Sequence, residues 1–233
     1  MSDLIDMALP FLWRGAQVTL LLGCVGIVVG FPLGVALALV RTGSRRVLVK
    51  TGDAYSAFFR GTPMLVQIFI IYYGLGSLGV VQNTPVLWWL FGDSLHCAMM
   101  TVVFNTVAYT SEIFRGAFQS VPKGMIEAAL ACGMSPRTIL TRIRFPLALR
   151  QALPAYGNEV AIVIKESSLA STITVLEITG YAKRLMSETF AIVEIFAIAS
   201  VFYLLINFFA LFMVRRVERW LENGAVDARR PVI

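Results

Sequence analysis

The sequence predicts an all-α membrane protein with five transmembrane helices, the N-terminus outside and the C-terminus inside. Three observations lead to this fold class. Only 15% of the 233 residues are charged and 58% are hydrophobic, whereas soluble domains carry about 25% charged residues. Several apolar stretches reach the roughly 20 residues that a helix needs to cross a bilayer. Basic clusters follow the first and the last of these stretches, and such clusters mark the cytoplasmic side.

The five predicted spans follow one another in sequence at residues 18–40, 55–78, 95–114, 152–173 and 195–214. The first is closed on the inside by Arg41, Arg45, Arg46 and Lys50, and the last by Arg215, Arg216 and Arg219. Residues 80–94 and 174–189 are then external. Lys183 and Arg184 lie in the second external segment, against the trend for positive charge to stay inside.

A stripe of glycines runs along the first predicted span. Gly26, Gly30 and Gly34 recur at every fourth residue, so they share one helix face. Small residues in this pattern let a second helix approach closely. That second helix can belong to the same chain or to another subunit, and we expect packing within the chain.

Two predicted spans carry polar residues that no lipid-facing helix would tolerate. In the third span the polar residues repeat at helical spacing, and the fourth span is the most polar of the five. Ionisable groups inside a membrane favour a substrate or ion pathway. The candidates for such a pathway are Asn105, Tyr109, Glu112, Glu159, Lys165, Glu166 and Ser167.

Some of the ionisable candidates also have a purely structural interpretation. Glu112 can pair with Arg115, three residues later, at the cytoplasmic boundary of its span. Lys165 can form a buried ion pair with Glu166 or with a partner on another helix.

The longest polar stretch between hydrophobic runs is the basic segment 121–154, which connects the third and fourth spans. Residues 125–132 favour a helix, and Gly133 then suits the C′ position that ends it. Ser135 can cap a second helix, with Pro136 at its first position. We therefore predict a cytoplasmic helix–turn–helix that a soluble partner binds.

The sequence lacks the residues that several classes of function require. No GxxxxGK[ST] phosphate loop is present, and His96 is the only histidine, so we predict neither a nucleotide site, a metal site nor a catalytic centre in this chain. The net charge of +6 comes from residues that flank hydrophobic runs, so nucleic acid is not an expected partner.

The basic segment resembles the EAA---G---------I-LP loop of the permease subunits of ABC importers. The matching residues are Glu127, Ala128, Ala129, Gly133, Ile143 and Pro146, with Phe145 in place of the usual leucine. Residues 58–75 and 105–124 resemble segments of polar amino-acid permeases. Residues 152–160, ALPAYGNEV, are similar to the M-type subunit of histidine, lysine, arginine, ornithine and opine importers.

This resemblance implies a single permease domain over residues 1–233, in the inner membrane of a bacterium, that transports basic amino acids or opines. It also implies three protein partners: a dimer of cytoplasmic ATPase subunits that bind ATP and Mg²⁺, a second permease subunit, identical or related, and a periplasmic or extracellular substrate-binding protein. The residues expected to contact the ATPase are Glu127, Ala128, Ala129, Gly133, Met134, Ser135 and Arg144.

Two alternatives remain at this stage. The basic segment can be an ordinary helical hairpin without a partner. The whole chain can also be a stand-alone homodimeric transporter or exporter of cationic amino acids, in which the charged residues of the third and fourth spans couple to protons. The second alternative gives the helix–turn–helix pattern no purpose.

Overall fold

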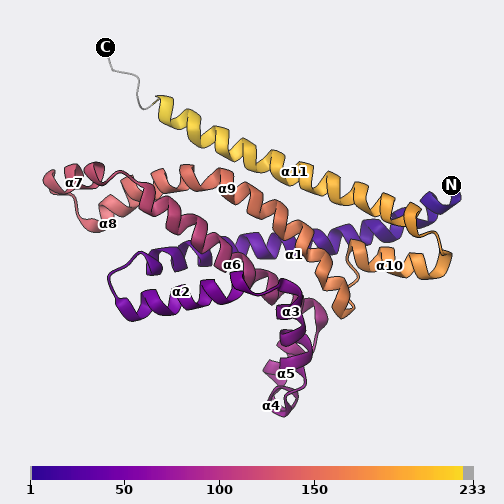
Figure 1. The fold of residues 1–233 in the computed structure, drawn as a ribbon. Coiled ribbons are helices and arrows are strands. Elements are labelled where there is room, and N and C mark those ends of the chain that lie inside the picture. Colours follow the sequence, from indigo (N-terminus) through magenta and orange to yellow (C-terminus); the bar gives the residue numbers. More distant parts are fainter. Residues whose placement is uncertain (1, 228–233) are drawn as a thin grey trace.

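The computed structural model describes residues 2–227, and this part of the chain contains helices and their connections but no strand, which confirms the all-α prediction. Four long helices run beside one another (Figure 1): α1 (Ser2–Arg41), α6 (Ser94–Ser120), α9 (Phe145–Glu166) and α11 (Ile192–Asp227). Two short helices, α7 and α8, lie at one end of these four, and α10 lies at the other end.

Two of the described helices are long and apolar enough to cross a membrane, at Leu4–Arg41 and Ile192–Leu221. Two bent pairs of helices raise the number of candidate spans to four, if each pair counts as one span. The predicted span at 152–173 is not among these four, because its polar residues lower its hydropathy. The five-span topology therefore stays a prediction.

Helix α1 is the central helix of the apolar core. Near its start, Leu12 packs with Ile178 and Ile195. Near its end, a second buried cluster joins it to α6 and α9. The same sequence of apolar residues that makes α1 a good span also makes it the surface against which the other long helices pack.

The glycine stripe of α1 faces α6. A Cβ atom added to Gly26 would lie 2.5 Å from Cγ1 of Val102, and one added to Gly34 would lie 2.5 Å from Cβ of Thr110. Such distances are too short for a side chain, so only glycine permits this close approach. The expected packing within the chain is confirmed.

This contact gives a stability prediction. Gly34→Ala is expected to lower the thermal unfolding midpoint of the purified protein, because the new methyl group overlaps Thr110 and lies 3.1 Å from the backbone oxygen of Val107. Overpacking of this kind costs about 1–3 kcal/mol. Gly23→Ala is the matched control, since its Cβ meets only Ile164, at 3.4 Å. Equal midpoints for the two variants in detergent solution would contradict the assigned contact.

The predicted second span, 55–78, is not one helix, and that prediction was wrong. The chain forms α2 (Arg46–Gly61), then α3 (Met64–Phe69), which continues into the π-helical turn η1 (Ile70–Leu75). The axis bends by 103° between α2 and α3. The segments after the bend lead away from the four long helices (Figure 1).

Pro63 causes the bend. A residue before proline is driven out of the helical region, and Thr62 is extended, with φ −115° and ψ 144°. The Gln67 side chain then bridges the break by donating to the carbonyl oxygens of Phe59, at 2.8 Å, and Thr62, at 3.0 Å. The bend is therefore encoded by the sequence and held by specific hydrogen bonds.

The segment expected to be external at 80–94 contains two short helices, α4 (Gly79–Asn83) and α5 (Pro85–Phe91). Trp88 and Trp89 are both exposed on α5. A bend of 76° separates α5 from α6.

The basic segment is helical for most of its length and contains α7 (Lys123–Ala131), α8 (Pro136–Ile139) and the π-helical turn η2 (Leu140–Arg144). Helix α9 follows η2 without a break. The second half of the basic segment and the start of the fourth predicted span are therefore one continuous helical stretch, and the start of that span near residue 152 stays a prediction. Pro146 lies directly after the π-helical turn η2, and proline cannot donate the backbone hydrogen bond of a regular helix interior.

Within the fourth predicted span, α9 gives way to the 3₁₀ helix η3 (Ser167–Ile173), which ends where the span was predicted to end. Helix α10 (Ile178–Thr189) follows in the segment expected to be external. Lys183 and Arg184 lie on its exposed face, where Lys183 donates to Ser171 and Arg184 pairs with Glu188 at 3.2 Å. Both charges therefore lie at the opposite end of the long helices from α7 and α8 (Figure 1).

Candidate functional site

The turn between α7 and α8 has the geometry that the sequence predicts. Gly133 has a φ of +76°, a conformation that strains residues with a Cβ atom. Its N–H donates to the carbonyl of Leu130 at 2.9 Å, and the N–H of Met134 donates to the carbonyl of Ala129 at 3.1 Å. These two bonds make a Schellman motif, which satisfies the last carbonyl groups of α7.

The second helix of the loop starts as predicted. Ser135 is its N-cap, and its hydroxyl accepts a hydrogen bond from the N–H of Thr138 at 3.3 Å. Pro136 occupies the first turn, where it costs no hydrogen bond. The loop is therefore a compact, locally determined unit.

The seven residues expected to contact an ATPase differ in their exposure to solvent. Glu127, Ala128, Gly133 and Ser135 are exposed, and they can contact a partner directly. Ala129 is buried and Met134 half-buried, so both support the turn from within.

Arg144, the seventh of these residues, lies at the base of the loop. Its guanidinium carbon is 5.4 Å from the ring centroid of Phe118 on α6, a cation–π contact. It also lines a groove of about 420 Å³ between the loop and the end of α1, together with Leu39, Thr42, Gly43, Ile126, Leu130, Pro136, Ile139 and Leu140.

Glu112 is the centre of a charge cluster that joins α1, α2 and α6. Its carboxylate lies 2.8 Å from the guanidinium of Arg41, 3.0 Å from that of Arg60 and 2.5 Å from that of Arg115. The expected pair with Arg115 is present. The side chain of Arg41 is only 6% exposed and also binds Asp53 at 2.8 Å. The sequence analysis used Arg41 only as a mark of the cytoplasmic side, and it did not predict that Arg41 binds Glu112 and Asp53.

Asn105 belongs to the bend between α2 and α3. Its side-chain amide donates to the Oε1 atom of Gln67 at 3.3 Å, so it links α6 to the group that bridges the break. Tyr109 lies one turn further along α6, and the guanidinium carbon of Arg60 is 5.8 Å from its ring centroid.

Glu159 of α9 is buried, with 4% of its surface exposed. Its Oε1 atom has no hydrogen-bond partner among the described residues. Glu166 follows Glu159 by seven residues on the same helix, so the two carboxylates lie on one face of α9. We call Glu159 and Glu166 the carboxylate cluster.

The alternative of a structural ion pair at Lys165 and Glu166 has no support within the described side chains. The ion pairs there join other residues, and neither Lys165 nor Glu166 lies within 4 Å of an opposite charge. Ser167 is buried and donates to the carbonyl of Ile164 at 2.8 Å, so it ends α9 and does not face an open space.

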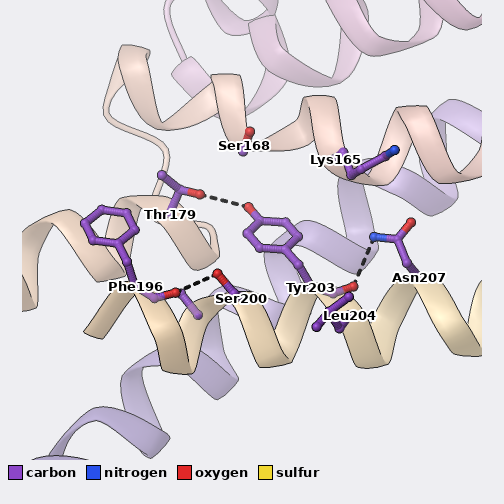
Figure 2. A pocket seen from close by; sticks show the side chains of 9 residues that line it. Lys165, Ser168, Thr179, Phe196, Ser200, Tyr203, Leu204 and Asn207 are labelled. Atoms are coloured by element: carbon purple, nitrogen blue, oxygen red, sulfur yellow. Dashed lines mark hydrogen bonds between the residues drawn. The ribbon is translucent and has the colours of Figure 1, made fainter. Parts of the chain in front are cut away.

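Lys165 lines a cavity of about 500 Å³ where α9 and η3 meet α10 and α11. Figure 2 shows Lys165 and Ser168 along one wall and Tyr203, Leu204 and Asn207 along the other. Neither Glu159 nor Glu166 lines this cavity. The residues predicted for one pathway therefore do not gather in one place. Lys165 lines this cavity, Glu159 and Glu166 form the carboxylate cluster, and Glu112 lies in its own charge cluster. Asn105 lies at the α2–α3 bend and Ser167 at the end of α9.

A hydrogen-bond network holds the side chain of Tyr203 in place in the wall of this cavity. The hydroxyl of Tyr203 donates to the carboxylate of Glu177 at 2.5 Å. The same carboxylate accepts from the N–H of Gly180 at 2.8 Å and from the hydroxyl of Thr19 at 3.4 Å. Glu177 is fully buried, so this network joins α1, α10 and α11. The sequence offers one signal for it, because a glutamate three residues before Gly180 can cap a helix.

The side chains described here offer groups for binding. The carboxylate cluster offers acceptors for a cationic group, and the cavity offers one ammonium group and several hydroxyl and amide groups. Within residues 2–227, no three His, Cys, Asp or Glu side chains gather in a way that could hold a metal ion.

Comparison with known proteins identifies the relatives of this chain. It is 45% identical to the nopaline transport system permease protein NocM of Agrobacterium fabrum, over 94% of this chain and 91% of that protein. It is 38% identical to the histidine/lysine/arginine/ornithine transport system permease protein HisM of Escherichia coli K12, over 92% and 93%.

A solved structure of an amino acid ABC transporter with histidines shares the fold, with a TM-score of 0.80 and 27% identity over 92% of this chain and 96% of that chain. Residues 30–223 match the model of the family described as the binding-protein-dependent transport system inner membrane component. The chain therefore belongs to this family, which consists of the permease components of ABC importers.

Proposed function

We propose that this chain is one half of the translocation pathway of an ATP-driven importer, and that the loop from α7 to α8 couples it to a separate ATPase. The observation that carries the proposal is the Gly133 turn, which presents Glu127, Ala128 and Ser135 to the solvent at one end of the long helices. The chain binds no ATP itself in this proposal. ATP and Mg²⁺ belong to the ATPase dimer, whose closure alternates the access of the pathway.

The proposed assembly lies in the inner membrane of a bacterium. It contains this chain as a single permease domain over residues 1–233, a second permease subunit and a binding protein outside. Five spans place the N-terminus outside and the C-terminus inside. The charge of the loop supports this orientation, because arginine and lysine favour the cytoplasmic side.

The proposed substrates are basic amino acids or their opine derivatives. The names of the relatives support this class, since they refer to nopaline and to histidine, lysine, arginine and ornithine. The carboxylate cluster supports it on physical grounds, because Glu159 is buried and its Oε1 atom has no hydrogen-bond partner in the described part of the chain, so it can accept a hydrogen bond from a cationic group. In this proposal Glu159, Glu166 and Tyr109 bind the cationic side chain, Lys165 in the neighbouring cavity binds a carboxylate, and Asn105 and Glu112 line the same pathway.

The assembly is tested by reconstitution. Proteoliposomes should contain this chain, its second permease and its ATPase, with the binding protein added outside and labelled L-arginine, L-histidine or nopaline as probes. Uptake that needs both ATP and the binding protein is the expected result. Uptake by the purified chain alone, driven by a proton gradient without ATP, would instead establish a stand-alone secondary transporter.

The carboxylate cluster gives a second prediction. Glu159→Gln and Glu166→Gln should each raise the KM for uptake of L-arginine about tenfold, because each removes one charge-assisted hydrogen bond worth about 1.5–3 kcal/mol. The measurement is the initial rate of uptake into the same proteoliposomes. Glu188→Gln is the control, since Glu188 is exposed on α10. Unchanged kinetics in both cluster variants would remove these carboxylates from the substrate site.

A further inference from the structure

The cavity that Lys165 lines has two walls of opposite hydrogen-bonding character (Figure 2). The first wall comes from α9 and η3, and it carries the ammonium of Lys165 and the hydroxyl of Ser168. An ammonium group can only donate hydrogen bonds. No ion pair among the described residues neutralises Lys165. This wall therefore offers a positive charge and hydrogen-bond donors to a bound anion.

The second wall comes from α11, and its hydroxyl groups already donate their hydrogen atoms within the protein. Tyr203 donates to the carboxylate of Glu177 at 2.5 Å, and Ser200 donates to the backbone carbonyl of Phe196 at 2.7 Å. Each hydroxyl has a single hydrogen atom, so toward the cavity both oxygen atoms can only accept. Thr179 lies 3.0 Å from the hydroxyl of Tyr203 and uses one of its two lone pairs, which leaves the other for a ligand.

Asn207 adds an acceptor that no described residue uses. Its side-chain nitrogen donates to the backbone carbonyl of Tyr203 at 3.0 Å, which fixes the orientation of the amide. The Oδ1 atom then points away from that carbonyl (Figure 2). It is buried, and it has no hydrogen-bond partner within residues 2–227. Because buried polar atoms nearly always have a partner, this oxygen indicates a donor that comes from a ligand.

A donor wall facing an acceptor wall matches the two charged groups of a free α-amino acid. The carboxylate of such a molecule accepts hydrogen bonds only, and its ammonium donates only. The cavity volume of about 500 Å³ lies within the range of about 300–1,000 Å³ that small-molecule sites occupy. Both groups of one amino acid can therefore bind in this cavity at the same time.

We propose that this cavity binds the main-chain end of the substrate as a zwitterion, and that Asn207 and Tyr203 recognise its α-ammonium. Lys165 and Ser168 bind the α-carboxylate on the opposite wall. Glu177 takes the hydrogen atom of Tyr203 and so keeps that hydroxyl an acceptor toward the substrate. This inference rests on the proposed function, in which the carboxylate cluster binds the cationic side chain of the same molecule.

The test is direct binding of labelled L-arginine to the purified complex of both permeases and the ATPase, without the binding protein. Two unlabelled competitors keep the guanidinium and each lack one main-chain group. Agmatine has no α-carboxylate, and desaminoarginine has no α-ammonium. The wild type should bind each competitor about tenfold or more weakly than L-arginine, because each loses a charge-assisted hydrogen bond. Equal affinity for L-arginine and either competitor would overturn the inference.

Variants of the two walls should affect the two preferences separately. Asn207→Leu should reduce the preference for L-arginine over desaminoarginine to about threefold or less, and it should leave the preference over agmatine unchanged. Lys165→Met should have the opposite effect. If Asn207→Leu lowered both preferences equally, Asn207 would act only on the shape of the cavity, and the inference would be wrong.

Asn83→Leu is the matched control, because Asn83 is exposed on α4 and does not line the cavity. Both of its preferences should equal those of the wild type, and a change equal to that of Asn207→Leu would count against the inference. Should Asn207→Leu prevent purification, Asn207→Asp decides. It keeps the oxygen and adds a charge, so it should increase the preference over desaminoarginine. No increase would overturn the inference.

Glu159→Gln separates this inference from the proposed function. It should weaken the binding of L-arginine, agmatine and desaminoarginine alike, since all three carry the guanidinium. If it weakens none of them, the side-chain site of the proposed function is wrong, whereas the two preferences still decide whether the cavity binds the zwitterion. If it weakens all three but Asn207→Leu changes neither preference, only the zwitterion inference fails.

Discussion

Replacing Gly133 with aspartate is expected to reduce ATP-driven uptake to less than about a tenth of the wild-type rate while the protein still folds and inserts. Within residues 2–227, no atom other than those of the adjoining residues lies within 4 Å of the position that a Cβ would occupy, so there is room for a side chain. The backbone cost is about 1 kcal/mol, because φ is +76°. An exposed carboxylate at the turn would instead obstruct a partner that binds there.

The measurements are uptake of the labelled substrate and the amount of the variant in purified membranes. Gly116→Asp is the control, because Gly116 is also exposed with open space around it but lies on α6, outside the loop. It should transport normally. Normal uptake by Gly133→Asp would show that the loop is not the joint to the ATPase, whereas loss of the protein from the membrane would show that the turn is needed for folding alone.

Glu177→Leu is expected to lower the thermal unfolding midpoint by about 10 °C. Leucine cannot accept the hydrogen bonds that Tyr203, Gly180 and Thr19 donate to the carboxylate. Each buried donor left without a partner costs about 1–3 kcal/mol, and in a protein of this size each kcal/mol corresponds to about 2–4 °C. The midpoint can be measured by size-exclusion chromatography of heated samples in detergent.

The control for this prediction is the same substitution on the same helix. Glu188 is exposed and forms a surface ion pair with Arg184, so Glu188→Leu should change the midpoint by only a degree or two, since such pairs contribute under about 1 kcal/mol. If both variants unfolded at the same temperature, the network around Glu177 could not be what holds α10 against α1 and α11.

The coupling loop was predictable from the sequence because its structure is local. The positive φ at Gly133 and the cap at Ser135 depend on residues within a few positions of each other. The break before Pro63 is equally local, and the order Gly-Thr-Pro was a usable signal for it. The sequence analysis nevertheless predicted one span across that break, because it relied on the apolar composition of the segment.

The side-chain partners of the site could not be predicted because they are distant in sequence. Arg41 and Glu112 are 71 residues apart, and Thr19 and Glu177 are 158 apart. Helical periodicity places Asn105, Tyr109 and Glu112 on one face of α6, but it cannot say which other helix meets each of them. Burial adds a second difficulty, since nothing in the residues around Glu177 shows that this carboxylate is inaccessible to solvent.

The unbroken helix from α8 through η2 to α9 has a mechanical consequence. Residues 136–166 span about 45 Å at the usual helical rise of 1.5 Å per residue. A tilt of about 5° at the Ser135 end would therefore swing Glu166 sideways by roughly 4 Å. Such a lever would need no hinge between the loop and the interior of the membrane. A small angular displacement at the Ser135 end would become an ångström-scale shift of the charged groups near Glu166.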